Sequence, residues 1–324
     1  MVEVLIKQTN KQTTMKNKIL ALLATIGLVA SASAVEINEN LSINGFIDGS
    51  YKMVDSDSST DTQSLDLDEV ELNFLLNVGN VSGTVNIDTD SGANDVDLEQ
   101  AHFTYSMDNG VSFTFGHYGS ALGFEREDPA GLYTFSRAYN DSAFNSGNID
   151  AAGNDVTGLS VAYAGDSYSL AASLHEAVGR NLENEDLNLE LSFAYTGVEN
   201  FSIGGGYAWD NQQTSANEVD EMNLHVATNM GKIFLAAEYT QLMNDTADRD
   251  AYMLLADYDF NDKWGAALRI SQNEQTGTNG DYEKVTLAPN YSFTDSLGVI
   301  LEYSDVTDNN VDTDEYAVEL TYTF

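Results

Sequence analysis

The four histidines are the side chains in this sequence with the most obvious capacity for catalysis. A hydrolase would need one of them beside a serine and a third polar group, with the histidine acting as general base. No G-x-S-x-G nucleophile motif occurs in the chain, and no other local pattern marks a nucleophile. We therefore expect structural or pore-lining histidines in a protein that is not an enzyme, with a hydrolase as the alternative. The four are His102, His117, His175 and His225.

One acidic stretch has a spacing that could bind calcium. In DTDSGANDVDLE, residues 88–99, oxygen ligands fall at positions 1, 3, 7 and 12 of a twelve-residue calcium loop. However, Gly92 occupies a ligand position and Ala93 occupies the place of the turn glycine, so a solvated loop is favoured. The chain contains no cysteine and no phosphate-binding or dinucleotide-binding motif. We expect no metal site and no cofactor.

Charges of both signs are concentrated between residues 119 and 155. An acidic segment that faces basic groups sets a transverse field, and charged rings bias which ions pass through a channel. We expect this stretch to be the third and longest external loop, folded inward so that it narrows a channel. An external lid or a solvated surface loop is the alternative. The candidate residues are Glu125, Arg126, Glu127, Asp128 and Arg137.

Alternating apolar and polar residues indicate the elements that must carry this loop. In EYAVELTYTF, at the carboxyl end, Tyr316, Val318, Leu320 and Tyr322 fall on one face and polar residues fall mostly on the other. Segments of about ten residues with this pattern can cross a bilayer as tilted strands. We expect sixteen strands, near residues 41–53, 68–78, 81–88, 98–106, 111–118, 156–164, 168–176, 187–196, 200–209, 219–229, 232–242, 251–260, 263–272, 283–293, 297–304 and 314–324.

The connections between these segments alternate between tight turns and longer polar loops. Outer-membrane barrels have this arrangement, with short periplasmic turns and long external loops. We therefore predict an all-β fold, a transmembrane antiparallel up-and-down β-barrel of about 16 strands, with a secreted β-sandwich as the alternative. The longer loops are expected near residues 54–67, 89–97, 119–155, 177–186, 210–218, 243–250, 273–282 and 305–313.

The amino end has the pattern of an export signal. Lys16 and Lys18 precede a short apolar run, and Ala32-Ser33-Ala34 supplies a small-residue cleavage site. The run is shorter than the about 20 residues of a transmembrane helix, and a core helix or membrane anchor is the alternative. The expected divisions are a leader at 1–34, made of an upstream mis-start at 1–14 and a secretory signal peptide at 15–34, and a barrel at 35–324.

The residues around the charged loop resemble a known family. LDLDEVELNF, LEQAHFTYSMDNGVSFTFG and GFEREDPAGLYTFSRAY together resemble the OmpL-like β-barrel porins, most clearly from about residue 43 to 163. The resemblance implies a barrel in the cell outer membrane, in contact with its lipid and lipopolysaccharide, and allows a homotrimer. The Tyr-Thr-Phe ending resembles the C-terminal strand signal that the barrel assembly machinery recognises.

A barrel of about sixteen strands is wide enough to leave a water-filled lumen. We therefore expect a passive outer-membrane channel for small hydrophilic solutes or ions, such as cations. Because no plug domain precedes the expected strands, the transport needs no energy coupling. A closed structural or adhesive outer-membrane barrel without channel activity is the alternative.

The chain is strongly acidic, with a formal net charge of -39 at pH 7. Such a chain repels phosphate backbones, so nucleic acid is not an expected partner. On the polar faces of the expected strands, acidic residues outnumber Lys52, Arg269 and Lys284, which predicts a cation preference. The alternative is that the acidity only keeps the lumen wet. The acidic residues expected to face the lumen are Asp48, Glu71, Glu190, Glu221, Glu238, Asp257, Glu302 and Glu319.

Overall fold

The computed structural model of the chain describes eight segments. The first begins at Ala34, so all but the last residue of the expected leader lies outside the described residues. In the part of the chain that the structure describes, no helix is long and apolar enough to cross a membrane. The segments are residues 34–90, 96–125, 129–139, 155–176, 187–210, 219–244, 248–275 and 281–324.

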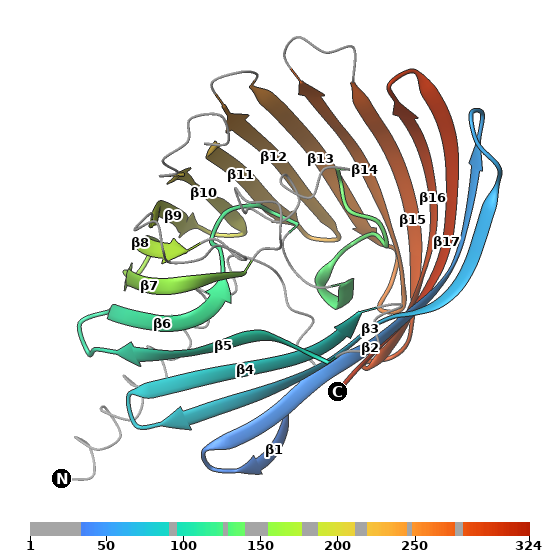
Figure 1. Ribbon diagram of the computed structural model, residues 1–324. Helices are drawn as coiled ribbons and strands as arrows, with labels where there is room; N and C mark the ends of the chain where they lie inside the picture. Colours follow the sequence, from blue (N-terminus) through green and yellow to red (C-terminus); the bar gives the residue numbers. More distant parts are fainter. Residues whose placement is uncertain are drawn as a thin grey trace.

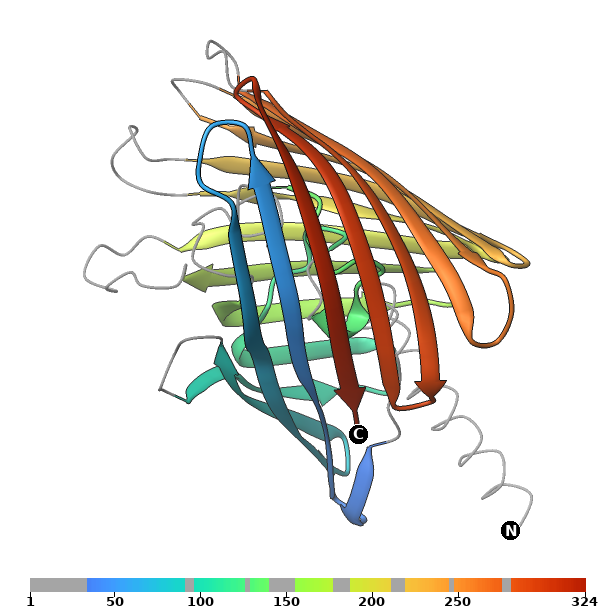
Figure 2. The ribbon, with the colours of Figure 1, turned by 90° about the vertical axis from the view of Figure 1, so that its right-hand side faces the viewer.

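Sixteen antiparallel strands form a closed barrel (Figure 1). Each strand pairs with its neighbours along the chain, and the last strand, β17, pairs with the first strand of the barrel, β2 (Figure 2). Closure leaves no open edge, so the backbone groups are satisfied without water. The predicted fold class is confirmed. The strands are β2 (Leu41–Ser56), β3 (Thr62–Val78), β4 (Val81–Asp90), β5 (Asp97–Ser106), β6 (Val111–Gly119), β7 (Asp155–Ala164), β8 (Tyr168–Glu176), β9 (Asn188–Val198), β10 (Phe201–Trp209), β11 (Asp220–Met230), β12 (Ile233–Met243), β13 (Arg249–Asp259), β14 (Trp264–Gln275), β15 (Tyr282–Thr294), β16 (Leu297–Asp308) and β17 (Val311–Thr323).

A short additional strand, β1 (Val35–Asn38), precedes the barrel and was missed by the sequence analysis. It pairs with the beginning of β2, where Val35 lies opposite Ile43. The end of the chain occupies the adjacent place, because Phe324 and Gly45 exchange two backbone hydrogen bonds. The opposite edge of β2 is paired with β3. The strand β1 therefore pairs with the same edge of β2 as β17 does, next to the end of β17. Four exposed residues carry too little alternation to mark a strand in the sequence.

The outer face of the barrel is apolar, as the alternation predicts. Leu254 on β13 is 60% exposed, and the neighbouring Tyr252 is also exposed. Aromatic pairs lie near the turns between strands, where the Trp264 and Tyr291 rings are 4.6 Å apart. A continuous apolar surface of this kind is unfavourable in water and is favourable in contact with hydrocarbon.

Two of the expected external loops are shorter than predicted. The loop expected at 305–313 is a two-residue turn, because β16 and β17 continue to Asp308 and Val311. Asn309 and Asn310 have positive φ angles of 52° and 64°, which is the left-handed pair that a type I′ hairpin turn requires. The loop expected at 54–67 is mostly strand in the same way. Aspartates recur through both stretches, so their sequences resemble loops, although Leu65 and Leu67 are exposed apolar residues on β3.

Candidate pore constriction

The segment between β6 and β7, here called loop 3, lies inside the barrel (Figure 1). Its described part comprises residues 120–125 and 129–139 and includes a single 3-10 turn, η1 (Pro129–Gly131). Starting beside β9, it passes along the inner wall as far as η1, which touches β17 and β2, and then returns toward β12. Loop 3 is therefore attached to the wall over much of the barrel's circumference.

Glutamates of the wall bind loop 3 through its backbone N–H groups. Glu190 on β9 accepts hydrogen bonds from the Ser120 hydroxyl at 2.7 Å and from the backbone N–H of Ala121 at 3.0 Å. Glu302 on β16 accepts one from the backbone N–H of Ser136 at 3.0 Å and another from its hydroxyl. Hydrogen bonds to carboxylates are stronger than those between neutral groups, so each glutamate is an anchoring point.

Glu238 on β12 is a third anchor of the same kind. It accepts the backbone N–H of Phe124 at 2.6 Å and the side-chain amide of Asn223 at 2.8 Å. The Tyr139 hydroxyl also donates to it at 3.4 Å. Burial raises the pKa of Tyr139 well above its usual value, and the nearby carboxylates of Glu238 and Glu125 raise it further. The phenol therefore stays protonated and remains a donor.

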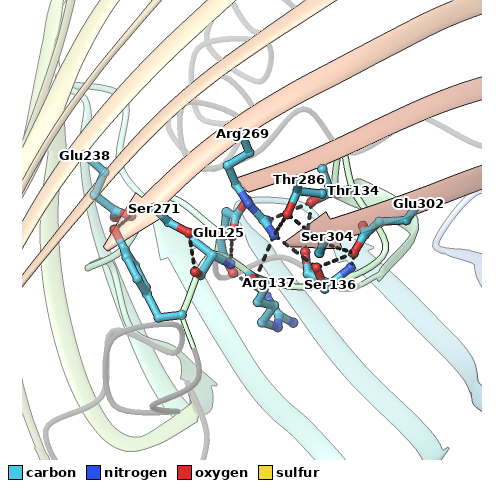
Figure 3. Close-up of polar contacts among 12 residues, drawn as sticks. Glu125, Thr134, Ser136, Arg137, Glu238, Arg269, Ser271, Thr286, Glu302 and Ser304 are labelled. Carbon is cyan, nitrogen blue, oxygen red and sulfur yellow. Dashed lines mark hydrogen bonds and ion pairs between the residues drawn. The ribbon is translucent and has the colours of Figure 1, made fainter. Parts of the chain in front are cut away.

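Arg269 on β14 connects both arms of loop 3 (Figure 3). It is completely buried, and its guanidinium donates to the Glu125 carboxylate and to the Thr134 hydroxyl, each at 2.7 Å. It also donates to the backbone carbonyl of Arg137 at 2.8 Å and to the Ser136 hydroxyl at 3.1 Å. Because Glu125 and Arg137 lie twelve residues apart, this one side chain holds the loop's outgoing and returning arms together.

Under loop 3 the inner wall is apolar, contrary to the expected polar inner face. Ala251, Met253 and Leu255 on β13 point inward and are buried against Ala138 and Tyr139 of the loop. The wall and the loop share a hydrophobic core there, inside the barrel. Burial of this apolar surface adds to the hydrogen bonds as a force that holds the loop down.

Further apolar contacts fix the loop at two other places. The Tyr133 ring stacks on Phe234 of β12, with centroids 4.9 Å apart and planes 10° apart. Leu122 is completely buried over β10, where a Cβ on Gly206 would come within 2.7 Å of it. A side chain at this position would collide with Leu122 of the loop and with the Leu191 carbonyl of β9, so the glycine is required there.

Carboxylates of neighbouring strands lie at the level of loop 3 and form what we call the acidic belt. Glu302, Glu319, Asp48 and Glu71 come from the successive strands β16, β17, β2 and β3. From one strand to the next, each carboxylate is two positions away from the residue that pairs with the preceding carboxylate. The row continues onto β4, where Asp88 pairs with Glu71. Closing a barrel of tilted strands staggers residues of equal height in this way. Glu302, which binds loop 3, thus belongs to a row that continues past the loop.

All eight acidic residues expected to face the lumen lie on the inner side of the wall. Seven are buried, whereas Asp257 is partly exposed. This burial differs from the water-filled setting expected, because the docked loop covers much of the wall. Within the described residues, neither carboxylate oxygen of Glu221 accepts a hydrogen bond. The eight are Asp48, Glu71, Glu190, Glu221, Glu238, Asp257, Glu302 and Glu319.

The charged residues expected in the loop have different surroundings. Glu125 is buried and binds Arg269 and the backbone N–H of Ala138, so it is an anchor. Arg137 donates to the Glu125 carbonyl, and its side chain points away from the Arg269 cluster (Figure 3). The remaining expected residues, Arg126, Glu127 and Asp128, lie outside the described residues.

The sequence did not reveal the uncharged residues of loop 3 that hydrogen-bond to the wall. Ser120, Thr134 and Ser136 have no distinguishing pattern around them, and their partners are more than sixty residues away. A usable signal did exist in β13, whose residues Ala251 to Ala256 are apolar on both faces. A strand that is apolar on its lumen side must be covered by something inside the barrel.

The closed barrel, its apolar outer surface and the loop inside it define an outer-membrane channel protein of the porin type. The sequence agrees with this class, since residues 20–324 match the family described as Gram-negative porin. The chain belongs to that family, which places it in the outer membrane. None of the curated proteins matches the chain.

Solved porin structures share the fold at low sequence identity. An anion-selective porin from Comamonas acidovorans is 12% identical with a TM-score of 0.69, covering 88% of this chain and 99% of that chain. OmpF of Salmonella typhi, in complex with daunomycin, is 15% identical with a TM-score of 0.67, covering 90% and 100%. In-vitro folded OmpT of Vibrio cholerae, in a trimer form, is 14% identical with a TM-score of 0.60, covering 88% and 100%. These similarities concern the fold.

Proposed function

We propose that this protein is a passive, water-filled channel that admits small hydrophilic solutes and ions and prefers cations. The acidic belt is the observation that carries the proposal, because it places a row of carboxylates along the inner wall at the level of loop 3. Diffusion through such a channel requires no covalent chemistry, and we propose no enzymatic activity.

The balance of lumen charges supports the cation preference. Of the three basic residues expected on the polar faces of the strands, Arg269 is paired with Glu125 at 2.7 Å and Lys284 with Glu315 at 3.0 Å. Lys52 is 3.5 Å from Asp68. The acidic residues outnumber these three, so a net negative potential remains. Two unit charges 4 Å apart interact by about 1 kcal/mol in water. Since 1.4 kcal/mol is a factor of ten, this gives roughly fivefold enrichment of cations.

A reversal potential measured across a potassium chloride gradient tests this preference. We expect the purified protein in a planar bilayer to give a reversal potential of the cation-selective sign. The variant Asp48→Asn with Glu319→Gln should move the value toward zero, because the negative charge of this pair is lost while the side-chain volumes are kept. A wild-type value near zero, or of the anion-selective sign, would contradict the cation preference.

We also propose that loop 3 forms the constriction of this channel. The number of its attachments to the wall supports a fixed position, and a fixed loop inside the lumen reduces the open cross-section. Glu125 serves in this arrangement as a structural anchor, and Arg137 is the loop charge that faces the open space. Arg126, Glu127 and Asp128 remain candidates from the sequence.

Export, assembly and oligomeric state complete the proposal. We propose that residues 15–34 are a signal peptide, which fits the start of β1 at Val35. The strand β17 would present the signal for the barrel assembly machinery, and the outer surface would contact lipid and lipopolysaccharide. Within the Gram-negative porins we propose the OmpL-like group. A homotrimer is the proposed assembly, supported by the trimer form of the OmpT structure.

A further inference from the structure

An aromatic patch lies where loop 3 meets the inner wall, near the tight turns that join β11 to β12 and β13 to β14. The Phe234 ring of β12 stacks on Tyr133 of the loop, with centroids 4.9 Å apart, and lies 6.4 Å from the Phe124 ring. All three residues are packed against the core that loop 3 shares with the wall, and all three are partly exposed. The patch therefore offers apolar surface to solutes at this end of the lumen.

Two aspartates of β13 lie beside this aromatic patch. Asp257 is the pairing partner of Phe234, so the two side chains point inward from neighbouring strands with their Cβ atoms about 5 Å apart. Asp259 lies two residues further along β13, on the same face of the strand. Burial raises the pKa of the Tyr133 hydroxyl, and the carboxylates of Asp257 and Asp259 raise it further, so the phenol lies near both. Two rings and two carboxylates thus form one group.

The protein itself does not neutralise these two aspartates. Asp259 is exposed and Asp257 is partly exposed, and neither forms an ion pair in the described part of the chain. The lysines of the adjacent turns have other contacts. The Lys232 ammonium donates to the Phe260 carbonyl at 2.7 Å, and the Lys263 ammonium is 5.9 Å from an aromatic ring of β15. A cation that enters from solution would therefore meet the exposed carboxylate of Asp259, with that of Asp257 beside it.

We propose that this group is a binding site for organic cations with an apolar portion, such as protonated aromatic amines. The ammonium binds Asp259 and Asp257, and the apolar portion lies against Tyr133 and Phe234. Hydrogen bonds between an ammonium and a carboxylate are charge-assisted, and aromatic rings attract cations as well as apolar groups. This inference rests on the proposed channel function and names a class of solute for it. The acidic belt lies on other strands, so its effect on simple cations is a separate property.

Block of the potassium current by benzylamine tests the site. Benzylamine is protonated at pH 7, and with wild-type channels in a planar bilayer we expect it to reduce the current in a saturable manner. Benzyl alcohol, which has nearly the same shape but no charge, should give no saturable block. Methylammonium, which has the charge but no ring, should need a higher concentration than benzylamine for half block.

Two single variants remove the charges of the site. Asp257→Asn and, separately, Asp259→Asn should raise the benzylamine concentration for half block by about two- to fivefold, the range expected for exposed ion pairs. Asp108→Asn supplies a matched control, because Asp108 is an exposed aspartate in the turn between β5 and β6, far around the barrel from β13. This control should show the block of the wild type. If either test variant fails to assemble, the other still decides the matter, because each removes one of the two carboxylates.

The possible results separate this inference from the channel function. Open channels that benzylamine blocks no more than benzyl alcohol does would overturn the site and leave the channel intact. A half-block concentration that is the same in Asp257→Asn, Asp259→Asn and Asp108→Asn would also overturn it, and so would a methylammonium block as strong as that of benzylamine. Protein that is assembled but conducts no current would contradict the proposed channel itself, and the site with it.

Discussion

Arg269 shows how a single buried charge can organise a large loop. Removing a cation completely from water is unfavourable unless its partners replace the lost hydration. Arg269 meets this condition with the Glu125 carboxylate, two hydroxyl groups of the loop and one backbone carbonyl. All four partners belong to loop 3, so they surround the guanidinium only when loop 3 is docked, and the charge stabilises the docked arrangement alone.

Replacing Arg269 with glutamine should loosen loop 3 without opening the barrel. Glu125 would keep its buried carboxylate with the main positive partner gone, and breaking such a pair from one side costs about 3–5 kcal/mol. We expect noisier single-channel currents and a higher mean conductance. Unchanged noise and conductance in correctly assembled channels would show that the apolar contacts hold the loop without Arg269.

The double variant Glu125→Gln with Arg269→Gln provides the control for this effect. When both charges are removed, no unpaired buried charge remains, and part of the loss should be recovered. Thermal unfolding of the detergent-solubilised protein measures this recovery. Strictly additive losses in the two single variants would contradict direct coupling between the two residues.

At the scale of strands and loops, the outer face was predictable and the inner face was not. Outward residues contact lipid and are therefore apolar, as Leu254 and Leu301 are. The resulting alternation identifies the strands from sequence alone. Inward residues meet either water or loop 3, and alternation cannot tell which. This is why a covered, apolar inner wall around Met253 was not expected. The bonds that dock the loop join residues as far apart as 166 positions, which no local pattern reports.

Deleting residues 125–137 should raise the single-channel conductance. The deletion removes η1 and both attachments around Arg269, whereas all sixteen barrel strands retain their pairing partners. The inner wall at β13 becomes exposed to water, so some loss of stability is expected as well. Conductance recordings check the first effect. Heat-modifiable migration in electrophoresis must confirm that the barrel has assembled. If an assembled variant has the wild-type conductance, loop 3 does not narrow the channel.

For the whole molecule, the junction between β17 and β2 completes the structure. The chain end takes part in it directly, because Phe324 exchanges backbone hydrogen bonds with Gly45. Its ring also lies 5.9 Å from that of Tyr322 and touches the place where Gly45 lacks a side chain. The last residue is therefore part of the closed ladder.

Replacing Phe324 with serine should lower the amount of assembled barrel, and removing residues 315–324 should lower it further. The first change removes an aromatic contact at the junction, and the second removes most of the ladder that β17 forms with β2. Outer-membrane fractions, analysed for heat-modifiable protein, measure the effect. Phe293→Ser is a suitable control, since Phe293 is an exposed aromatic residue near the end of β15, away from the junction. Equal yields for all three variants and the wild type would exclude a special role for the chain end.

The same junction sets the order of events in biogenesis. The hydroxyl of Thr321 on β17 donates to Asp48 on β2, which lies 273 positions earlier in the sequence. The two strands that close the barrel are therefore synthesised first and last among its strands. A partly made chain has β2 but lacks the strand that must lie beside it, and its open edge cannot be stable in hydrocarbon. The barrel can therefore be completed only after β17 has been synthesised. Until then the open edge of β2 has to stay out of hydrocarbon.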